Sequence, residues 1–138
     1  MPEHFRSIVT RLREYVADRR RSPRFRLRLA CVVSLHEPEG ARRAAQAVEG
    51  YTRDLSASGL SLVLPAVRVG ERYLTAAGVT LRIQLAHPTG PLELLATTVH
   101  YDQLGGEEED RGFLVGVRLV EMNAADRARY ETHLKQLS

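Results

Sequence analysis

Residues 25–35 carry an apolar side chain at every odd position, whereas the even positions include Arg26, Arg28 and Ser34. Successive side chains of a β-strand point to opposite faces, so this period of two predicts a strand with one buried and one solvent-facing side. Such a strand exposes a continuous apolar face if it stands alone. The rest of the chain must therefore supply further strands that cover this face.

Five further segments have the composition of strands. They cover residues 45–53, 59–65, 78–86, 92–102 and 112–122. The stretches between them are rich in Gly, Pro and charged residues, and no long helical pattern separates them. We therefore predict a mainly β fold, a six-stranded antiparallel barrel, in which residues 64–74 cross from one part of the barrel to another.

A helix is predicted at each end of this barrel. Residues 4–18 place apolar side chains at helical spacing and indicate a short amphipathic helix. That helix could dock on its own domain, pair with a second copy in a homodimer, or lie on a membrane surface, and the first two are favoured. Residues 124–137 form the second helix, with Asn123 as N-cap, Asp126 at the third helical position, and Tyr130 in its apolar stripe.

Composition places the chain among ordinary globular domains. Its 138 residues are 43% hydrophobic and 27% charged, which suits one domain with its own core. Cys31 is the single cysteine, so no disulfide framework exists, and we expect it to be a small buried apolar side chain. No apolar stretch has the length of a signal peptide core or a membrane span, and a cytoplasmic location is expected.

Catalysis requires groups that converge, and the sequence offers few. The five histidines are scattered without a second ligand at metal-binding spacing, and no nucleophile elbow, phosphate-binding loop or dinucleotide fingerprint is present. The acidic residues 107–110 fit a solvated loop between two strands. We therefore predict a protein that is not an enzyme and that has neither a catalytic residue, a metal nor a cofactor.

The positive charge is concentrated at one end. Residues 1–28 hold nine arginines and three acidic residues, a net charge of +6, while the remaining chain is net −3. Within this end, Arg20 and Arg24 are spaced as R-x-x-x-R, and Pro23 prevents helix continuation between them. Guanidinium groups on such a loop match two phosphate oxygens, or the O6 and N7 acceptors of guanine.

A second pattern, D-x-S-x-x-G, follows the predicted return strand at Asp54, Ser56 and Gly59. A carboxylate accepts hydrogen bonds and complements the N1–H and N2–H donors of guanine. Glycine permits a backbone conformation, or a close ligand approach, that a side chain would prevent. Asp and Ser before Gly can also simply stabilise a turn, so this pattern alone is weak.

Together and in this order, "RRSPR" and "DLSASG" resemble the signature of the PilZ domain, a bacterial receptor for the second messenger cyclic di-GMP. The final strand and helix, "RGFLVGVRLVEMNAADRARY", are similar to those of that family as well. The resemblance covers residues 19–138. It implies an arginine loop at 19–25, a barrel over about 25–122 and a helix over about 124–137, with residues 1–18 as a separate N-terminal helix.

The resemblance also implies roles for individual residues. Arg20 and Arg24 would contact the phosphates and guanine of cyclic di-GMP, and Asp54 and Ser56 would bind a guanine edge. Gly59 would allow close approach of the ligand.

Two more arginines belong to the predicted site. Arg21 lies inside the motif with a less certain role. Arg19, immediately before the motif, could stack on an additional guanine, which predicts two ligands per protomer. The arginine loop would change conformation on binding and signal to a separate downstream protein.

Two alternatives remain. A PilZ-like domain can act as a protein-interaction module without binding nucleotide, although such members usually lack one of the two motifs. A small barrel with a basic end can instead bind nucleic acid. The net acidic body and an aromatic content of only 6% make nucleic acid the less favoured partner.

Overall fold

The computed structural model describes residues 23–36, 46–105 and 112–137. The helix predicted over residues 4–18 and the acidic residues 107–110 lie outside the described residues.

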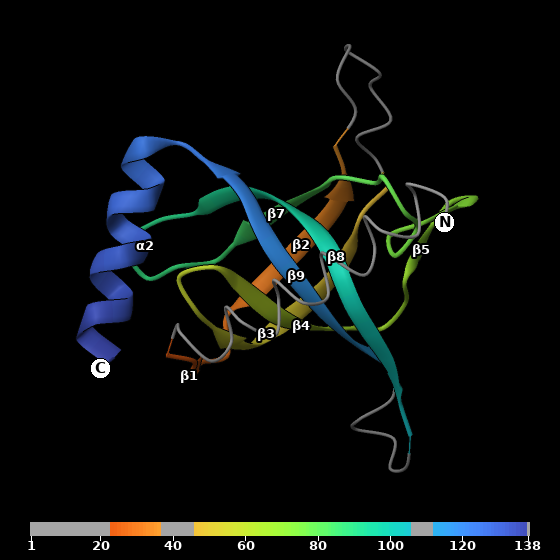
Figure 1. Ribbon diagram of the computed structural model, residues 1–138, viewed down its shortest axis with the longest axis horizontal. Helices are drawn as coiled ribbons and strands as arrows, with labels where there is room; N and C mark the ends of the chain where they lie inside the picture. Colours follow the sequence, from red (N-terminus) through yellow and green to blue (C-terminus); the bar gives the residue numbers. More distant parts are fainter. Residues whose placement is uncertain (1–22, 37–45, 106–111, 138) are drawn as a thin grey trace, which may run out of the picture.

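Six strands close into a barrel (Figure 1). They are β2 (Ala30–Leu35), β3 (Val48–Leu55), β4 (Gly59–Leu64), β7 (Leu81–Leu85), β8 (Leu92–Leu104) and β9 (Gly112–Met122). The sheet order β3-β2-β7-β8-β9-β4 is completed by pairing of β3 with β4, and every pairing is antiparallel. The predicted mainly β, six-stranded antiparallel barrel is confirmed.

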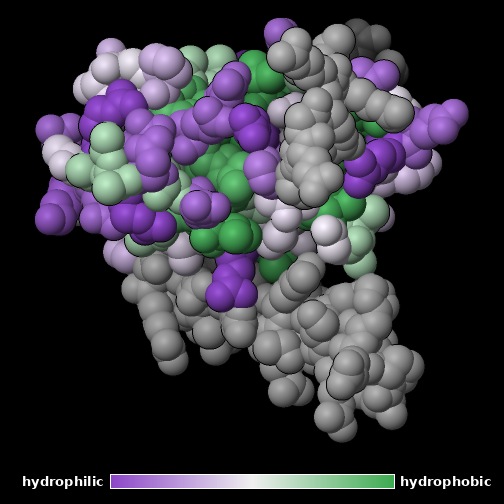
Figure 2. Space-filling model, turned by 90° about the horizontal axis from the view of Figure 1, so that it is seen from above, coloured by the Kyte–Doolittle hydropathy of each residue, from purple (hydrophilic) through white to green (hydrophobic). Residues whose placement is uncertain are grey.

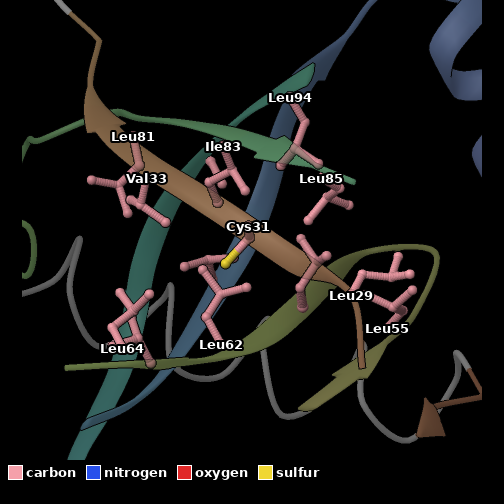
Figure 3. Packing of buried hydrophobic residues seen from close by; sticks show 14 of the residues in the cluster. Leu29, Cys31, Val33, Leu55, Leu62, Leu64, Leu81, Ile83, Leu85 and Leu94 are labelled. Carbon is pink, nitrogen blue, oxygen red and sulfur yellow. The ribbon is translucent and has the colours of Figure 1, made fainter. Parts of the chain in front are cut away.

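The barrel interior is filled by aliphatic side chains that alternate along each strand. On β4, for example, Leu60, Leu62 and Leu64 are at most 1% exposed. Figure 3 shows side chains of this kind from several strands converging on one core, with Cys31 among them. Burying one such leucine contributes about 1.5–3 kcal/mol, so this core is the main source of the barrel's stability. Cys31 is 2% exposed, as predicted for a small apolar side chain.

The strand predicted over residues 25–35 is interrupted. A two-residue strand, β1 (Phe25–Arg26), precedes β2, and the residues between them pair with the side chain of Thr52 on β3. The Thr52 hydroxyl accepts from Leu29 N at 2.8 Å and donates to Leu27 O at 2.6 Å. The pairing of β3 with β4 shifts by one residue between Thr52 and Asp54. The Thr52 hydroxyl therefore supplements two main-chain hydrogen bonds, from Thr52 N to Leu29 O at 2.8 Å and from Leu27 N to Arg53 O at 3.4 Å, and the alternation of burial continues.

The crossing segment contains a hairpin that the sequence did not indicate. It consists of β5 (Arg68–Val69) and β6 (Arg72–Tyr73). The turn between them includes Gly70 with φ of 62°, a conformation that glycine adopts without steric cost.

Helix α2 (Ala124–Leu137) packs beside the barrel at its C-terminal end (Figure 1). The Asn123 side chain accepts from Asp126 N at 2.8 Å, which confirms the predicted N-cap. Tyr130 and Leu134 are the buried residues of the helix. Helix α2 thus shows a narrow buried stripe on an otherwise polar surface.

The outer surface is largely polar. Figure 2 shows one face of the molecule, on which hydrophilic side chains surround a small central group of hydrophobic ones. Within the described ranges, every helix is too short or too polar to cross a membrane.

Candidate functional site

Strands β3 and β4 place Asp54 and Ser61 next to each other on the outside of the barrel. The two residues are partners in the antiparallel register, and the following pair is Leu55 with Leu60. Both leucines are buried in the core, so the preceding pair points to the opposite, outer face. The alternation that fills the barrel therefore also presents a carboxylate and a hydroxyl on its surface.

Arg24 joins these two side chains from the N-terminal segment. Its Nη2 group donates to Asp54 Oδ1 at 2.5 Å and to Ser61 Oγ at 2.6 Å. The side chains of Arg24 and Asp54 are only 16% and 15% exposed. A charge-assisted hydrogen bond that is partly shielded from water is stronger than an exposed ion pair. The two halves of the sequence signature therefore meet directly, although Arg24 and Asp54 are 30 residues apart.

The turn between β3 and β4 is closed by Ser56 and Gly59. Ser56 N donates to Gly59 O at 2.9 Å, and Ser56 Oγ donates to the same carbonyl at 3.1 Å. Gly59 N donates back to Ser56 Oγ at 3.2 Å. Ser56 is 4% exposed, and its hydroxyl both donates and accepts hydrogen bonds within the turn. The Ser56 side chain therefore stabilises the conformation of the turn.

Gly59 is required by the barrel itself. A Cβ atom at this position would lie 2.2 Å from Val117 O on β9, well inside van der Waals contact. Because Gly59 pairs with Arg118 on β9, the close approach of the two strand backbones leaves no space for a side chain. This intramolecular contact is a reason for glycine in addition to the predicted approach of a ligand.

Tyr130 of helix α2 forms a hydrogen bond with the turn. Its hydroxyl donates to Ser56 O at 2.6 Å, across 74 residues of sequence, and the side chain is 2% exposed. Burial raises the pKa of Tyr130, the hydrogen bond to Ser56 opposes this change, and the charge of Asp54 raises the pKa further. The tyrosine therefore lies within electrostatic reach of the Asp54 carboxylate.

We call Arg24, Asp54, Ser56, Gly59 and Ser61 the β3–β4 site. The structure brings four of the predicted residues together here, while the predicted Arg19, Arg20 and Arg21 lie outside the described residues. Sequence reasoning missed Ser61 and the contact of Tyr130 with the turn. The register of β4 could have indicated Ser61, since it stands two positions after Gly59 on the same face. No local signal marks the tyrosine contact, because its partner is a backbone carbonyl.

Arg28 lies outside this group of contacts, whereas Arg26 is the cross-strand partner of Asp54 in the pairing of β1 with β3. Both are exposed, as predicted for the wet face of the first strand. The guanidinium of Arg28 stacks 3.8 Å from the centre of the Tyr51 ring on β3.

The β3–β4 site is equipped for binding an anion or a polar base edge. It combines a guanidinium and a carboxylate, each about one-sixth exposed, with the Ser61 hydroxyl that bonds to the same guanidinium. Among the described residues, no group of three or more His, Cys, Asp or Glu side chains could hold a metal ion. Burial raises the pKa of the Cys31 thiol to about 11, which disfavours the reactive thiolate.

A model of the PilZ domain family matches residues 18–136. The chain belongs to the PilZ domain family. The match spans the barrel and nearly all of α2, and it includes both arginine motif positions and the β3–β4 turn. A search of the curated protein sequences gave no match.

Solved PilZ structures share this fold. The PilZ domain with c-di-GMP of YcgR from Escherichia coli is 13% identical, with a TM-score of 0.59, covering 86% of this chain and 91% of that one. The K. pneumonia MrkH complex with c-di-GMP is 18% identical, with a TM-score of 0.62. Bacillus subtilis MotI/DgrA, an inhibitor of motility, is 17% identical, with a TM-score of 0.59. This chain covers 86% of its own length in both latter matches but only 51% and 50% of those proteins.

Proposed function

We propose that this PilZ domain is a non-catalytic cytoplasmic receptor for cyclic di-GMP, which binds at the β3–β4 site. The observation that carries the proposal is the convergence of Arg24 on Asp54 and Ser61, because it unites the two halves of the family signature on one outer face. Two similar structures, the PilZ domain of YcgR and MrkH, contain c-di-GMP.

Ligand binding would exchange partners within the site. Asp54 would accept the N1–H and N2–H donors of a guanine, while Arg24 would turn its fork toward a phosphate or toward O6 and N7 of the base. Before binding, the ion pair between these residues keeps both groups on the same outer face of the barrel. The exchange replaces one charge-assisted interaction by two, so it does not strand a partly buried charge.

The affinity should suit a reversible signal. Charged hydrogen bonds contribute about 1.5–3 kcal/mol each, and association and ordering costs offset much of their sum. A dissociation constant of about 1 μM, equivalent to about −8 kcal/mol, is the expected result.

Arg20 and Arg21 would complete the ligand contacts from the N-terminal side, and Arg19 would stack on a second cyclic di-GMP molecule. The expected stoichiometry is therefore two ligands per protomer. Isothermal titration calorimetry measures it directly, and a value near one would remove the role of Arg19 without affecting the receptor function.

The signal would pass through the arginine segment. The ligand would attach this segment to the barrel and thereby change the surface next to β3 and β4. A separate downstream protein would bind to the changed surface. Residues 1–18 offer an additional contact for such a protein or for a second copy of the chain.

The deciding experiment is a calorimetric titration of the full chain with cyclic di-GMP. GTP and a short single-stranded DNA are titrated in separate runs as control ligands. We expect tight binding of cyclic di-GMP alone, and a loss of about 100-fold in affinity for Arg24→Ala and for Asp54→Ala. Arg28→Ala is the matched control, because this exposed arginine follows Arg24 on the same segment and its guanidinium stacks on Tyr51 instead of facing Asp54.

The alternatives give different results. Equal binding of DNA, lost in Arg26→Ala and Arg28→Ala, would identify a nucleic-acid barrel. A wild-type protein that binds none of the three ligands would identify a protein-interaction module. Binding that is indifferent to Asp54→Ala would also contradict the proposed receptor site.

A further inference from the structure

Helix α2 contacts the β3–β4 turn through a buried hydrogen bond. The Tyr130 hydroxyl donates to Ser56 O at 2.6 Å, and Ser56 is itself 4% exposed. If this hydrogen bond breaks, a buried hydroxyl and a buried carbonyl are left without a hydrogen-bond partner, which raises the free energy of the folded state. The turn and the helix are therefore held together by more than apolar packing.

The contact fixes an orientation that the turn does not fix by itself. The hydroxyl and amide of Ser56 are both used to close the turn toward Gly59, so the turn is an internally bonded unit. The carbonyl of Ser56 points out of that unit, toward α2. The unit is therefore held at two carbonyls, that of Ser56 by Tyr130 and that of Ser58 by the amide of Leu119 on β9 at 2.8 Å.

Asp54 and Ser61 stand at the two ends of this unit. Asp54 is two residues before Ser56, and Ser61 is two residues after Gly59, in register with Asp54. A tilt of the turn would displace Asp54 and Ser61 together, and with them the carboxylate that is proposed to bind a guanine edge. The geometry needed for ligand recognition thus depends on the helix.

The helix itself is held firmly at a second place. Arg129 donates to Gly90 O at 3.1 Å and to Pro91 O at 2.8 Å, and Asp126 accepts from Glu93 N at 3.0 Å. These contacts attach α2 to the loop between β7 and β8 and to the start of β8. Helix α2 therefore acts as a brace between that loop and the β3–β4 turn.

We infer that Tyr130 is a positioning residue for the β3–β4 site and that it couples ligand binding to the docking of helix α2. The inference rests on the proposed binding of cyclic di-GMP. Coupling is reciprocal, so a ligand that requires the held orientation of the turn also strengthens the docking of the helix.

Tyr130→Phe tests the inference, because it removes the hydroxyl and keeps the ring in the core. Calorimetry on the full chain should show cyclic di-GMP affinity reduced about three- to tenfold, the range that one lost hydrogen bond produces. The matched control is Thr98→Val, since Thr98 Oγ1 also donates to a backbone carbonyl, that of Leu74, at 3.1 Å. This control should lower the melting temperature and leave the affinity within twofold of wild type.

Amide hydrogen exchange provides a readout that simple destabilisation does not produce. Saturating cyclic di-GMP should slow exchange of the α2 amides near Tyr130 in the wild type and in Thr98→Val, but much less in Tyr130→Phe. If Tyr130→Phe binds as tightly as wild type while Arg24→Ala fails to bind, the positioning role is wrong and the receptor function stands. If wild type fails to bind, both fall.

Discussion

Two arginines, Arg24 and Arg129, each pair with an aspartate on the outside of the barrel, but their surroundings differ. Arg24 reaches the side chains of Asp54 and Ser61. Arg129 pairs with Asp126 at 2.7 Å, and it also donates to backbone carbonyls of the loop between β7 and β8. Asp126 in turn accepts from a backbone amide, that of Glu93.

The difference separates a structural contact from a binding site. Backbone groups must find partners on folding, and the hydrogen bond from the Glu93 amide, followed by that from Arg129, lowers the pKa of Asp126. A ligand cannot replace such partners without opening the loop. Side-chain acceptors such as Asp54 and Ser61 can rotate and accept other donors, so the Arg24 cluster can exchange partners while the barrel stays closed.

Replacing each arginine separately tests whether Arg24 serves binding and Arg129 serves stability. Arg24→Ala should reduce cyclic di-GMP affinity about 100-fold and change the free energy of unfolding by less than about 1 kcal/mol. Arg129→Ala should act mainly on stability, with a loss of about 1–2 kcal/mol because two backbone carbonyls lose their donor, and should lower the affinity no more than Tyr130→Phe does, because the contact of Tyr130 with the turn remains. Calorimetry and urea denaturation measure the two quantities. The same pattern in both variants would show that the distinction is wrong.

Gly59→Ala should affect both properties, since Gly59 belongs to the binding turn and to the contact of β4 with β9. The added Cβ would lie 2.2 Å from Val117 O, and we expect a loss of about 1–3 kcal/mol in stability as the strands separate. Ligand affinity should fall with it, because Ser61 follows on the displaced strand. Gly78→Ala is a useful control, as no atom lies within 4 Å of a Cβ built there, although its φ of 79° adds some strain. Unchanged stability of Gly59→Ala would contradict the described approach of the strands.

The smallest expected effect is a pH dependence of stability that arises from His87, next to helix α2. His87 Nε2 lies 2.7 Å from His133 Nδ1, and its ring also contacts Thr89. Burial lowers the pKa of His87 below its usual value of 6.5, and the nearby His133 and Arg129 lower it further. The unfolded chain therefore binds a proton at a higher pH than the folded protein, so stability should fall as the pH drops below about 6.5.

A melting curve at pH 7.5 and at pH 5.5 checks this expectation. Wild type should melt a few degrees lower at the acidic pH. His87→Gln, which retains a hydrogen-bonding side chain but does not titrate, should show a smaller difference. An identical pH response in the two proteins would exclude His87 as its source.

Much of the fold could be predicted from local pattern. The alternation of residues 25–35, the five other strand segments and the bounds of α2 follow from side-chain periodicity and capping, which neighbouring residues determine. The interruption near Thr52 could not be predicted, because it depends on a hydroxyl from another strand that bonds to the backbone of Leu27 and Leu29. The β5–β6 hairpin was missed for a similar reason, since strands of two residues carry no periodic signal.

The site divides in the same way. Arg24, Asp54, Ser56 and Gly59 were predicted as site residues from residue type, spacing and the resemblance to the PilZ signature. Their contacts with one another, with Ser61 and with Tyr130 depend on strand register and helix docking, which bring together residues 30 to 74 positions apart. Local chemistry thus specifies which groups are available for binding, whereas long-range packing of the barrel specifies where they point. That orientation is the result of closing six strands at once, and no short segment contains it.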